Sequence, residues 1–268
     1  MLRLGLLGAG HLPVLFSIVF VTNLGLTYVL AVRAGHVDPL FPYMSADGDT
    51  RPESCVFSLL LNICSILSML IVWLRTTLVS ELVHHDDHML QGLNKISVYF
   101  GMAGGFAMMI VANFQETAVT VVHLSAAFIC FSSGCLYMFL QSAVTIRMAP
   151  MYANARIGKI RLALSVLSAI ALISAITFGR LAAAEFHRYF PDLPTPRPWN
   201  RKTWQPGYGL HEISAVSEWM VGILHVLFVL SFSRDFEKLH VSVNYRMISN
   251  HLDISRVPSY HNIAEVVP

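Results

Sequence analysis

Charged residues are scarce in this sequence. Only 13% of its residues are Asp, Glu, Lys or Arg, against about 25% in ordinary soluble domains. Hydrophobic residues make up 55%, and the mean hydropathy is +0.58. The net charge of +2, without a basic cluster, argues against nucleic-acid binding. The composition is that of a membrane protein, and 268 residues leave no room for a second sizeable soluble domain.

The motifs of common enzymes are also missing. The sequence has no G-x-S-x-G, H-E-x-x-H, Walker or dinucleotide fingerprint, so it predicts no enzyme, cofactor or metal site. No N-x-S/T acceptor is present, so glycosylation gives no marker of orientation. The cysteines lie in or beside apolar runs, where thiols typically pack as small apolar groups and form no disulfide framework; they are Cys55, Cys64, Cys130 and Cys135.

Long apolar runs dominate the sequence. A helix rises about 1.5 Å per residue and the hydrocarbon core is about 30 Å thick, so about 20 apolar residues are needed to cross it. The sequence predicts an all-α, six-transmembrane-helix bundle with segments 12–32, 55–74, 96–115, 118–146, 162–182 and 213–232. The first run is too long for a secretory signal peptide and is predicted to stay as an uncleaved span.

The six segments place both termini on one side of the membrane. Residues 1–239 form the predicted membrane domain, and residues 240–268 form a cytosolic tail, predicted to be disordered. Lys and Arg near the span ends favour cytosolic termini, because cytosolic connections carry an excess of these residues. Eleven of the 18 fall on the side of the termini: Arg3, Arg75, Lys95, Arg147, Arg156, Lys159, Arg161, Arg234, Lys238, Arg246 and Arg256.

The last segment carries ionisable residues on one face. His211, Glu218 and His225 are spaced seven apart, and a carboxylate inside a span should face the bundle interior and have a partner. One interpretation is a proton relay, a metal-ligand pair or a lipid-headgroup site. The favoured one is a structural hub that bonds Glu218 to Asn23, Asn62, Asn113, His123 or Gln141. The candidate intramembrane polar site therefore comprises Glu218, His225, His123, Asn62 and Asn113.

Two acidic stretches outside the spans are predicted to be solvated. The sequence "HHDDH", residues 84–88, has imidazoles at i and i+4 that could hold a divalent metal on a helix. Residues 47–53 resemble a fragment of a calcium loop but lack its twelve-residue spacing. In each case we favour a solvated loop. Gly101 and Gly105, at G-x-x-x-G spacing, favour close helix packing inside the monomer, with homodimerisation as the alternative.

Two tetrapeptides in the tail have the form tyrosine-x-x-bulky apolar residue. They are "YRMI", Tyr245 to Ile248, and "YHNI", Tyr260 to Ile263. Adaptor complexes read this form when they sort membrane proteins to endosomes and lysosomes, although it also arises by chance. The motifs predict clathrin-adaptor binding through the tail, with Tyr260 and Ile263 the better pair because they lie farther from the membrane.

Several stretches together resemble one family. "GHVDPLFPYMSADGDTRPESCVFSLLLN", "VANFQET", "HLSAAFICFSSGCLYMFLQS" and "SEWMVGILHVLFVLSFSRDFEKL" are similar to the damage-regulated autophagy modulator (DRAM) proteins. These six-span proteins belong to a broader group that includes regulators of phospholipid distribution and GPI-lipid remodelling factors. The resemblance covers residues 12–239 and leaves the tail unmatched.

The resemblance implies a protein of lysosomal membranes, and also of late endosomes and the plasma membrane, that promotes autophagy. In some members this activity is coupled to stress-induced cell death. It supplies no catalytic residues, no cofactor and no protein partner. The first connection would then face an acidic lumen, where His36 beside Asp38 could titrate; a solvated loop without sensing is favoured. The alternative function is lipid handling, with membrane lipids as partners: a scramblase, its regulator or a lipid-remodelling enzyme.

Overall fold

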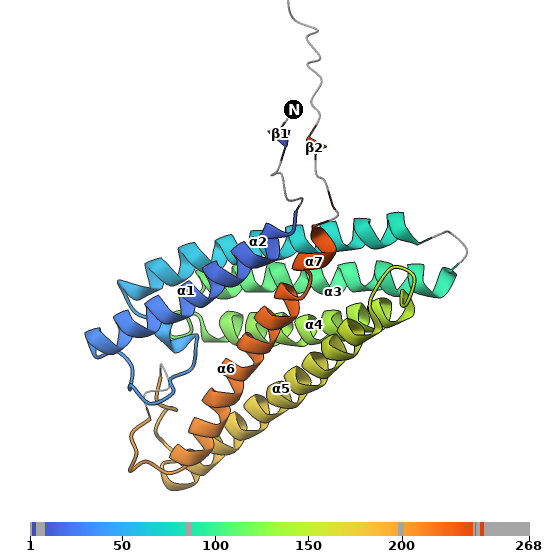
Figure 1. Cartoon of the computed structure of the whole chain (residues 1–268). Coiled ribbons are helices and arrows are strands. Elements are labelled where there is room, and N and C mark those ends of the chain that lie inside the picture. The colour runs from blue at the N-terminus through green and yellow to red at the C-terminus, as the bar shows by residue number, and fades with distance from the viewer. Residues whose placement is uncertain are drawn as a thin grey trace, which may run out of the picture.

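The computed structural model describes residues 2–3, 9–83, 87–197, 201–237, 239 and 242–243, and long helices dominate it (Figure 1). They are α1 (His11–Ala34), α2 (Glu53–Leu82), α3 (His88–Asn113), α4 (Thr120–Arg147), α5 (Ala155–Tyr189) and α6 (Tyr208–Leu230). The short elements are η1 (Ala46–Gly48), α7 (Ser233–Phe236), β1 (Leu2–Arg3) and β2 (Ser242–Val243). Six helices, with α6 counted together with α7, are long and apolar enough to cross a membrane. The predicted six-helix bundle is confirmed.

The helices extend beyond the apolar runs that predict them. The sequence places the end of the second segment before Arg75, yet α2 continues to Leu82. The fifth segment is predicted to begin at residue 162, but α5 begins at Ala155, where the Asn154 side chain accepts a hydrogen bond from the Arg156 amide and caps the helix. Hydropathy locates the part of a helix that faces lipid, whereas capping and backbone hydrogen bonds decide where the helix ends.

Large apolar side chains cover the outside of the bundle, and small ones allow the helices to approach inside it. Ile18, Leu59 and Ile173 are each more than half exposed, as expected for side chains that contact lipid. A Cβ on Gly101 would lie 2.7 Å from the methyl groups of Val72, and Ser65 donates a hydrogen bond to the carbonyl of Gly105 at 2.6 Å. The G-x-x-x-G pair therefore packs α3 against α2 within the monomer.

The two described ends of the chain lie together where α1 begins and α7 ends (Figure 1). The Ala9 amide donates to the carbonyls of Phe236 and Leu239, and β1 pairs antiparallel with β2. These contacts join the start of α1 to α7. We call this the termini end.

Two buried arginines organise the interior near the termini end. Arg75 of α2 and Arg161 of α5 are 2% and 0% exposed. Both donate to the same carboxylate oxygen, Oδ2 of Asp235 in α7, at 3.0 and 2.8 Å. The ring of Phe232 lies 5.1 and 4.5 Å from their guanidinium carbons. Buried charges need compensating partners. The single negative charge of Asp235 offsets only one of the two guanidinium charges, and the cation–π contacts with Phe232 add further stabilisation.

Hydrogen bonds from the two arginines to uncharged acceptors complete this arginine network. Arg75 also donates to Gln141 and Thr145 of α4, and Arg161 donates to Thr145 and to the hydroxyl and carbonyl of Ser231. The network thus joins α2, α4 and α5 to the segment that follows α6. Gln141, a predicted partner of Glu218, is committed here to Arg75 and to the hydroxyl of Ser97.

Candidate functional site

Three connections pack together at the end opposite the chain ends, and we call them the cap: residues 35–52, 114–119 and the described parts of 190–207. Asp49 accepts hydrogen bonds from the amide and hydroxyl of Thr117 at 2.9 and 2.6 Å. Glu116 forms an ion pair with Arg197 at 2.7 Å and accepts from the Ser45 hydroxyl at 3.5 Å. The short connection at residues 114–119 is therefore the centre to which both longer connections attach.

The cap also attaches to α6 and α5. The Trp219 indole donates to the Pro42 carbonyl at 2.8 Å. The Tyr43 hydroxyl donates to Ser214 at 2.6 Å, and Ser214 donates in turn to the Ala175 carbonyl. Burial raises the pKa of the Tyr43 phenol, so the hydroxyl keeps the proton that it donates. The ring of His211 packs edge-on against Tyr43, which places this histidine beside the cap.

The acidic residues of the first connection are buried, so the prediction of a solvated loop is wrong. Asp47 and Glu53 are both 0% exposed. His36 hydrogen-bonds one oxygen of Glu53, while both oxygens of Asp47 have no hydrogen-bond partner in the described chain. Burial, and then the charge of Glu53, raise the pKa of Asp47 to about 8. Asp47 is therefore protonated at neutral pH, since a neutral acid tolerates burial better than a carboxylate.

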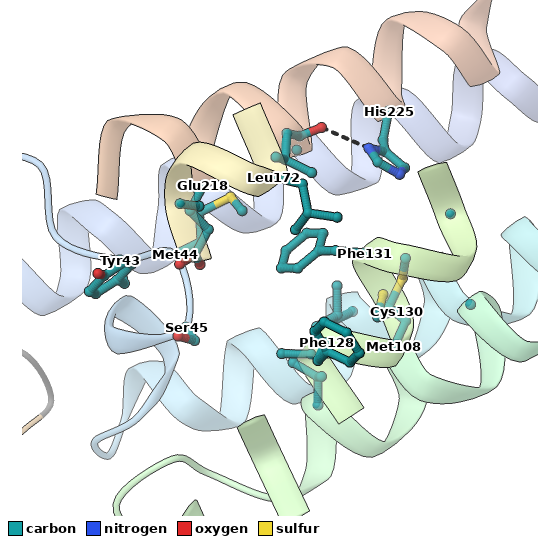
Figure 2. Close-up of a pocket in the computed structure, with 18 of the residues that line it drawn as sticks. Tyr43, Met44, Ser45, Met108, Phe128, Cys130, Phe131, Leu172, Glu218 and His225 are labelled. Atoms are coloured by element: carbon teal, nitrogen blue, oxygen red, sulfur yellow. Dashed lines mark hydrogen bonds between the residues drawn. The ribbon is translucent and has the colours of Figure 1, made fainter. Parts of the chain in front are cut away.

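A cavity of about 550 Å³ lies below the cap, with residues from all six long helices in its wall. Its volume is within the range of about 300–1,000 Å³ typical of small-molecule sites. Figure 2 shows that its two ends differ: Tyr43, Ser45 and Glu218 gather at one end, while Phe128 and Phe131 lie at the other. α5 diverges from α4 toward the cap (Figure 1). The site is thus an apolar chamber with a polar end at the cap.

Glu218 contributes the carboxyl group at the polar end of the cavity. Met44 and Ser45 of the cap lie beside it in the cavity wall, so the first connection folds back over α6 and covers an acid that would otherwise be costly inside a membrane. The sequence predicts a partner for Glu218 but not its nature. Side-chain amides on other spans are expected, whereas the backbone of the cap lies beside the carboxyl group.

His225 and His123 also line the cavity. His225 Nδ1 hydrogen-bonds the carbonyl of Val221 at 2.8 Å, as drawn in Figure 2, and His123 Nδ1 bonds that of Phe114 at 2.6 Å. The Nε2 atoms of both imidazoles have no hydrogen-bond partner in the described residues. A Cβ on Gly134 would lie 2.5 Å from His225 Nε2, so the absence of a side chain there leaves room for the imidazole.

The other predicted site residues lie elsewhere. Asn62 and Asn113 bond each other reciprocally at 3.1 and 3.0 Å between α2 and α3, outside the cavity wall. Asn23 is fully buried, and its amide has no partner in the described chain. Of the five candidates, the structure therefore brings Glu218, His225 and His123 to one cavity. The tail motifs with Tyr245, Ile248, Tyr260 and Ile263, and residues 84–86 of "HHDDH", fall outside the described residues.

The polar and charged residues of the cavity wall that sequence reasoning missed include Ser45, Glu116, Arg180 and Arg197. Three of these four lie in connections, whose packing depends on contacts far apart in the sequence. Arg180 had a readable signal, because it is the only Lys, Arg, Asp or Glu in the predicted segment 162–182. An ionisable residue inside a span marks a candidate site.

Comparisons with known proteins agree with this architecture. Residues 8–239 match the family model described as "Frag1/DRAM/Sfk1/Cwh43P N-terminal domain". The chain is 31% identical to human DNA damage-regulated autophagy modulator protein 2 over 81% of its length and 80% of the relative, and 32% identical to human modulator protein 1 over 82% and 87%. It is 26% identical to Modulator of macroautophagy TMEM150B-B of Xenopus laevis, over 92% and 96%.

No solved structure matches the chain. The family model nevertheless covers the whole six-helix bundle, and the relatives align over most of both lengths. The chain therefore belongs to the Frag1/DRAM/Sfk1 family, as its cap sequences indicate.

Proposed function

We propose that this protein modulates autophagy, in the promoting direction, from lysosomal and late endosomal membranes, with part of the pool at the plasma membrane. The observation that carries the proposal is the likeness to relatives named autophagy modulators along most of the chain. Their names describe modulators and no enzyme, which supports a role without catalysis. Coupling to stress-induced cell death is part of the same proposal.

The proposed orientation places the termini end in the cytosol and the cap in the lumen. The excess of Lys and Arg around the termini end supports it. The tail would then be accessible to cytosolic adaptors, and the buried acids of the cap would face an acidic compartment.

Imaging of an endogenously tagged chain with lysosomal and endoplasmic reticulum markers tests the location. We expect overlap with the lysosomal marker. Stable residence in the endoplasmic reticulum would contradict the proposal. Protease protection of a tag at each terminus tests the orientation, since cytosolic tags are digested in intact organelles.

Replacement of Tyr260 by alanine is expected to move protein from lysosomes to the cell surface. An adaptor must hold Tyr260 and Ile263 together in an extended segment, and loss of the tyrosine removes one of these two contacts. Surface biotinylation measures the shift, with Tyr245→Ala as the matched control nearer the membrane. Equal surface levels of wild type and both variants would show that targeting lies outside these motifs.

The cavity favours lipid handling as a second candidate function. Its polar end carries Glu218 below the cap, and its wall includes all six helices, an arrangement that could expose a lipid to an internal polar group. Purified protein in liposomes with fluorescent phospholipids measures lipid movement and hydrolysis. We expect Glu218→Gln to lower any such activity, because it replaces the carboxyl group that α6 supplies to the polar end with an amide that cannot ionise. Activity equal to that of protein-free liposomes would contradict this candidate.

A further inference from the structure

One basic side chain of the cavity wall belongs to α5. Arg180 of α5 lines the cavity, and in the described chain it makes no ion pair or hydrogen bond. It follows Gly179, where a Cβ would meet the hydroxyl oxygens of Ser214 at 2.9 Å and Tyr43 at 3.3 Å. This neighbourhood places Arg180 at the polar end. Its side chain is exposed, and an exposed guanidinium without a protein partner inside a predicted span favours an anionic ligand.

The other charged residues at this end have neighbours in the cap. Arg197 is paired with Glu116 at 2.7 Å, and Glu218 lies beside Met44 and Ser45 of the cap. No ion pair joins either acid to Arg180 in the part of the chain that the structure describes. Of the two arginines in the cavity wall, Arg180 is therefore the one for which the described residues supply no ion pair.

The depth of Arg180 suits a lipid headgroup. At about 1.5 Å per residue, the 35 residues of α5 exceed the hydrocarbon thickness of about 30 Å, so both helix ends project beyond the core. Arg180 lies about 12 Å from the midpoint of the helix by the same rise, near the edge of the hydrocarbon. An anion bound there would lie at headgroup level.

The apolar part of the cavity suits an acyl chain. Phe128, Phe131 and Leu172 point into it, with Met108 nearby (Figure 2). Burial of methylene groups among such side chains is favourable by about 0.8 kcal/mol each. A ligand that fills both regions is therefore an amphiphile with an anionic head.

We propose that the cavity binds an acyl chain of an anionic lipid whose carboxylate or phosphate head is held by Arg180. The guanidinium fork bonds either group in a bidentate manner. This inference goes beyond the modulation of autophagy and requires no lipid transport or hydrolysis, so its failure and the failure of either proposed function are distinguishable. A free fatty acid and an anionic phospholipid share the required chemistry.

Native mass spectrometry of the purified, delipidated full-length protein tests the proposal with oleate, dioleoylphosphatidylserine and dioleoylphosphatidylcholine as probes. Two variants test the polar end and the apolar part of the cavity separately. Arg180→Gln removes the cation, and Leu172→Trp fills the apolar part. Each has a matched control on α5 outside the cavity wall, Arg188→Gln and Leu167→Trp, both at exposed positions. Thermal unfolding of each variant reports whether it is folded.

We expect wild type and both controls to retain an anionic probe in preference to phosphatidylcholine. Arg180→Gln should weaken retention of that probe about tenfold or more, as expected for a lost charged hydrogen bond, with phosphatidylcholine little changed. Leu172→Trp should abolish retention of every probe. Retention of oleate alone identifies a free fatty acid as the ligand. Retention of phosphatidylserine as well shows that the site also accepts an anionic phospholipid. Equal retention of all three probes, or anionic retention that survives both Arg180→Gln and Leu172→Trp, would overturn the proposal.

Discussion

Replacement of Asp235 by asparagine is expected to lower the free energy of unfolding by about 3–5 kcal/mol, the usual cost of removing one member of a buried ion pair. Its Oδ2 atom is the only carboxylate oxygen that the structure records as paired with the buried guanidinium groups of Arg75 and Arg161. Asparagine has nearly the same shape, so the variant removes the charge and leaves the packing. Two buried cations would then face each other without an anion.

Thermal or chemical unfolding of the purified protein in detergent measures this effect. Glu237→Gln is the matched control, because it removes an exposed acid just after α7 and should change stability by less than about 0.5 kcal/mol. An unfolding midpoint of Asp235→Asn equal to that of this control would contradict the assigned role of the arginine network.

The second large effect is a dependence of stability on pH that originates at Asp47. Its pKa is raised to about 8 in the folded protein, from a usual value of 3.8, because the side chain is buried and lies near Glu53. Between these two values the folded state binds more protons than the unfolded state, so stability falls as pH rises. The contribution is fully present below about pH 4 and is lost as pH approaches 8.

The slope from this group approaches about 1.4 kcal/mol per pH unit at most, so the protein should be more stable at pH 5 than at pH 7 by about 2–3 kcal/mol. Asp47→Asn should flatten that part of the profile, because the amide is neutral throughout. The exposed cap residue Asp192 supplies the control variant Asp192→Asn. Unfolding midpoints in detergent at pH 5, 6, 7 and 8 measure the slope. A wild-type profile that is flat, or that rises with pH, would contradict the burial of an unpaired acid here.

The helices were readable from the sequence because lipid imposes a simple rule on length and polarity. Each predicted segment overlaps one long helix. The ends were harder to predict, since Arg75 and Arg161 look like the edges of spans but lie inside α2 and α5. Their partner Asp235 is far away in the chain. A network that joins distant segments leaves no local pattern, so the sequence could not distinguish a buried arginine from one that faces the cytosol.

A residue of the candidate site could be predicted only where its own type and position within a span pointed to a site. Glu218 was identified because an acid inside a span needs a partner, and it does line the cavity. Its neighbours in the cap, Met44 and Ser45, were not identifiable, since they lie far away in the chain and no local pattern links them to Glu218. The buried state of Asp47 was likewise missed, because acids among prolines usually indicate a solvated loop.

The most direct test asks whether autophagy depends on the cavity. In cells depleted of the protein, autophagic flux is measured as lysosome-dependent degradation of a cytosolic reporter, and the cells are rescued with wild type, Leu172→Trp or Leu167→Trp at matched levels and location. We predict that depletion lowers flux, that wild type and Leu167→Trp restore it, and that Leu172→Trp does not. Unchanged flux after depletion, or full rescue by Leu172→Trp, would contradict the proposed role of the cavity in autophagy.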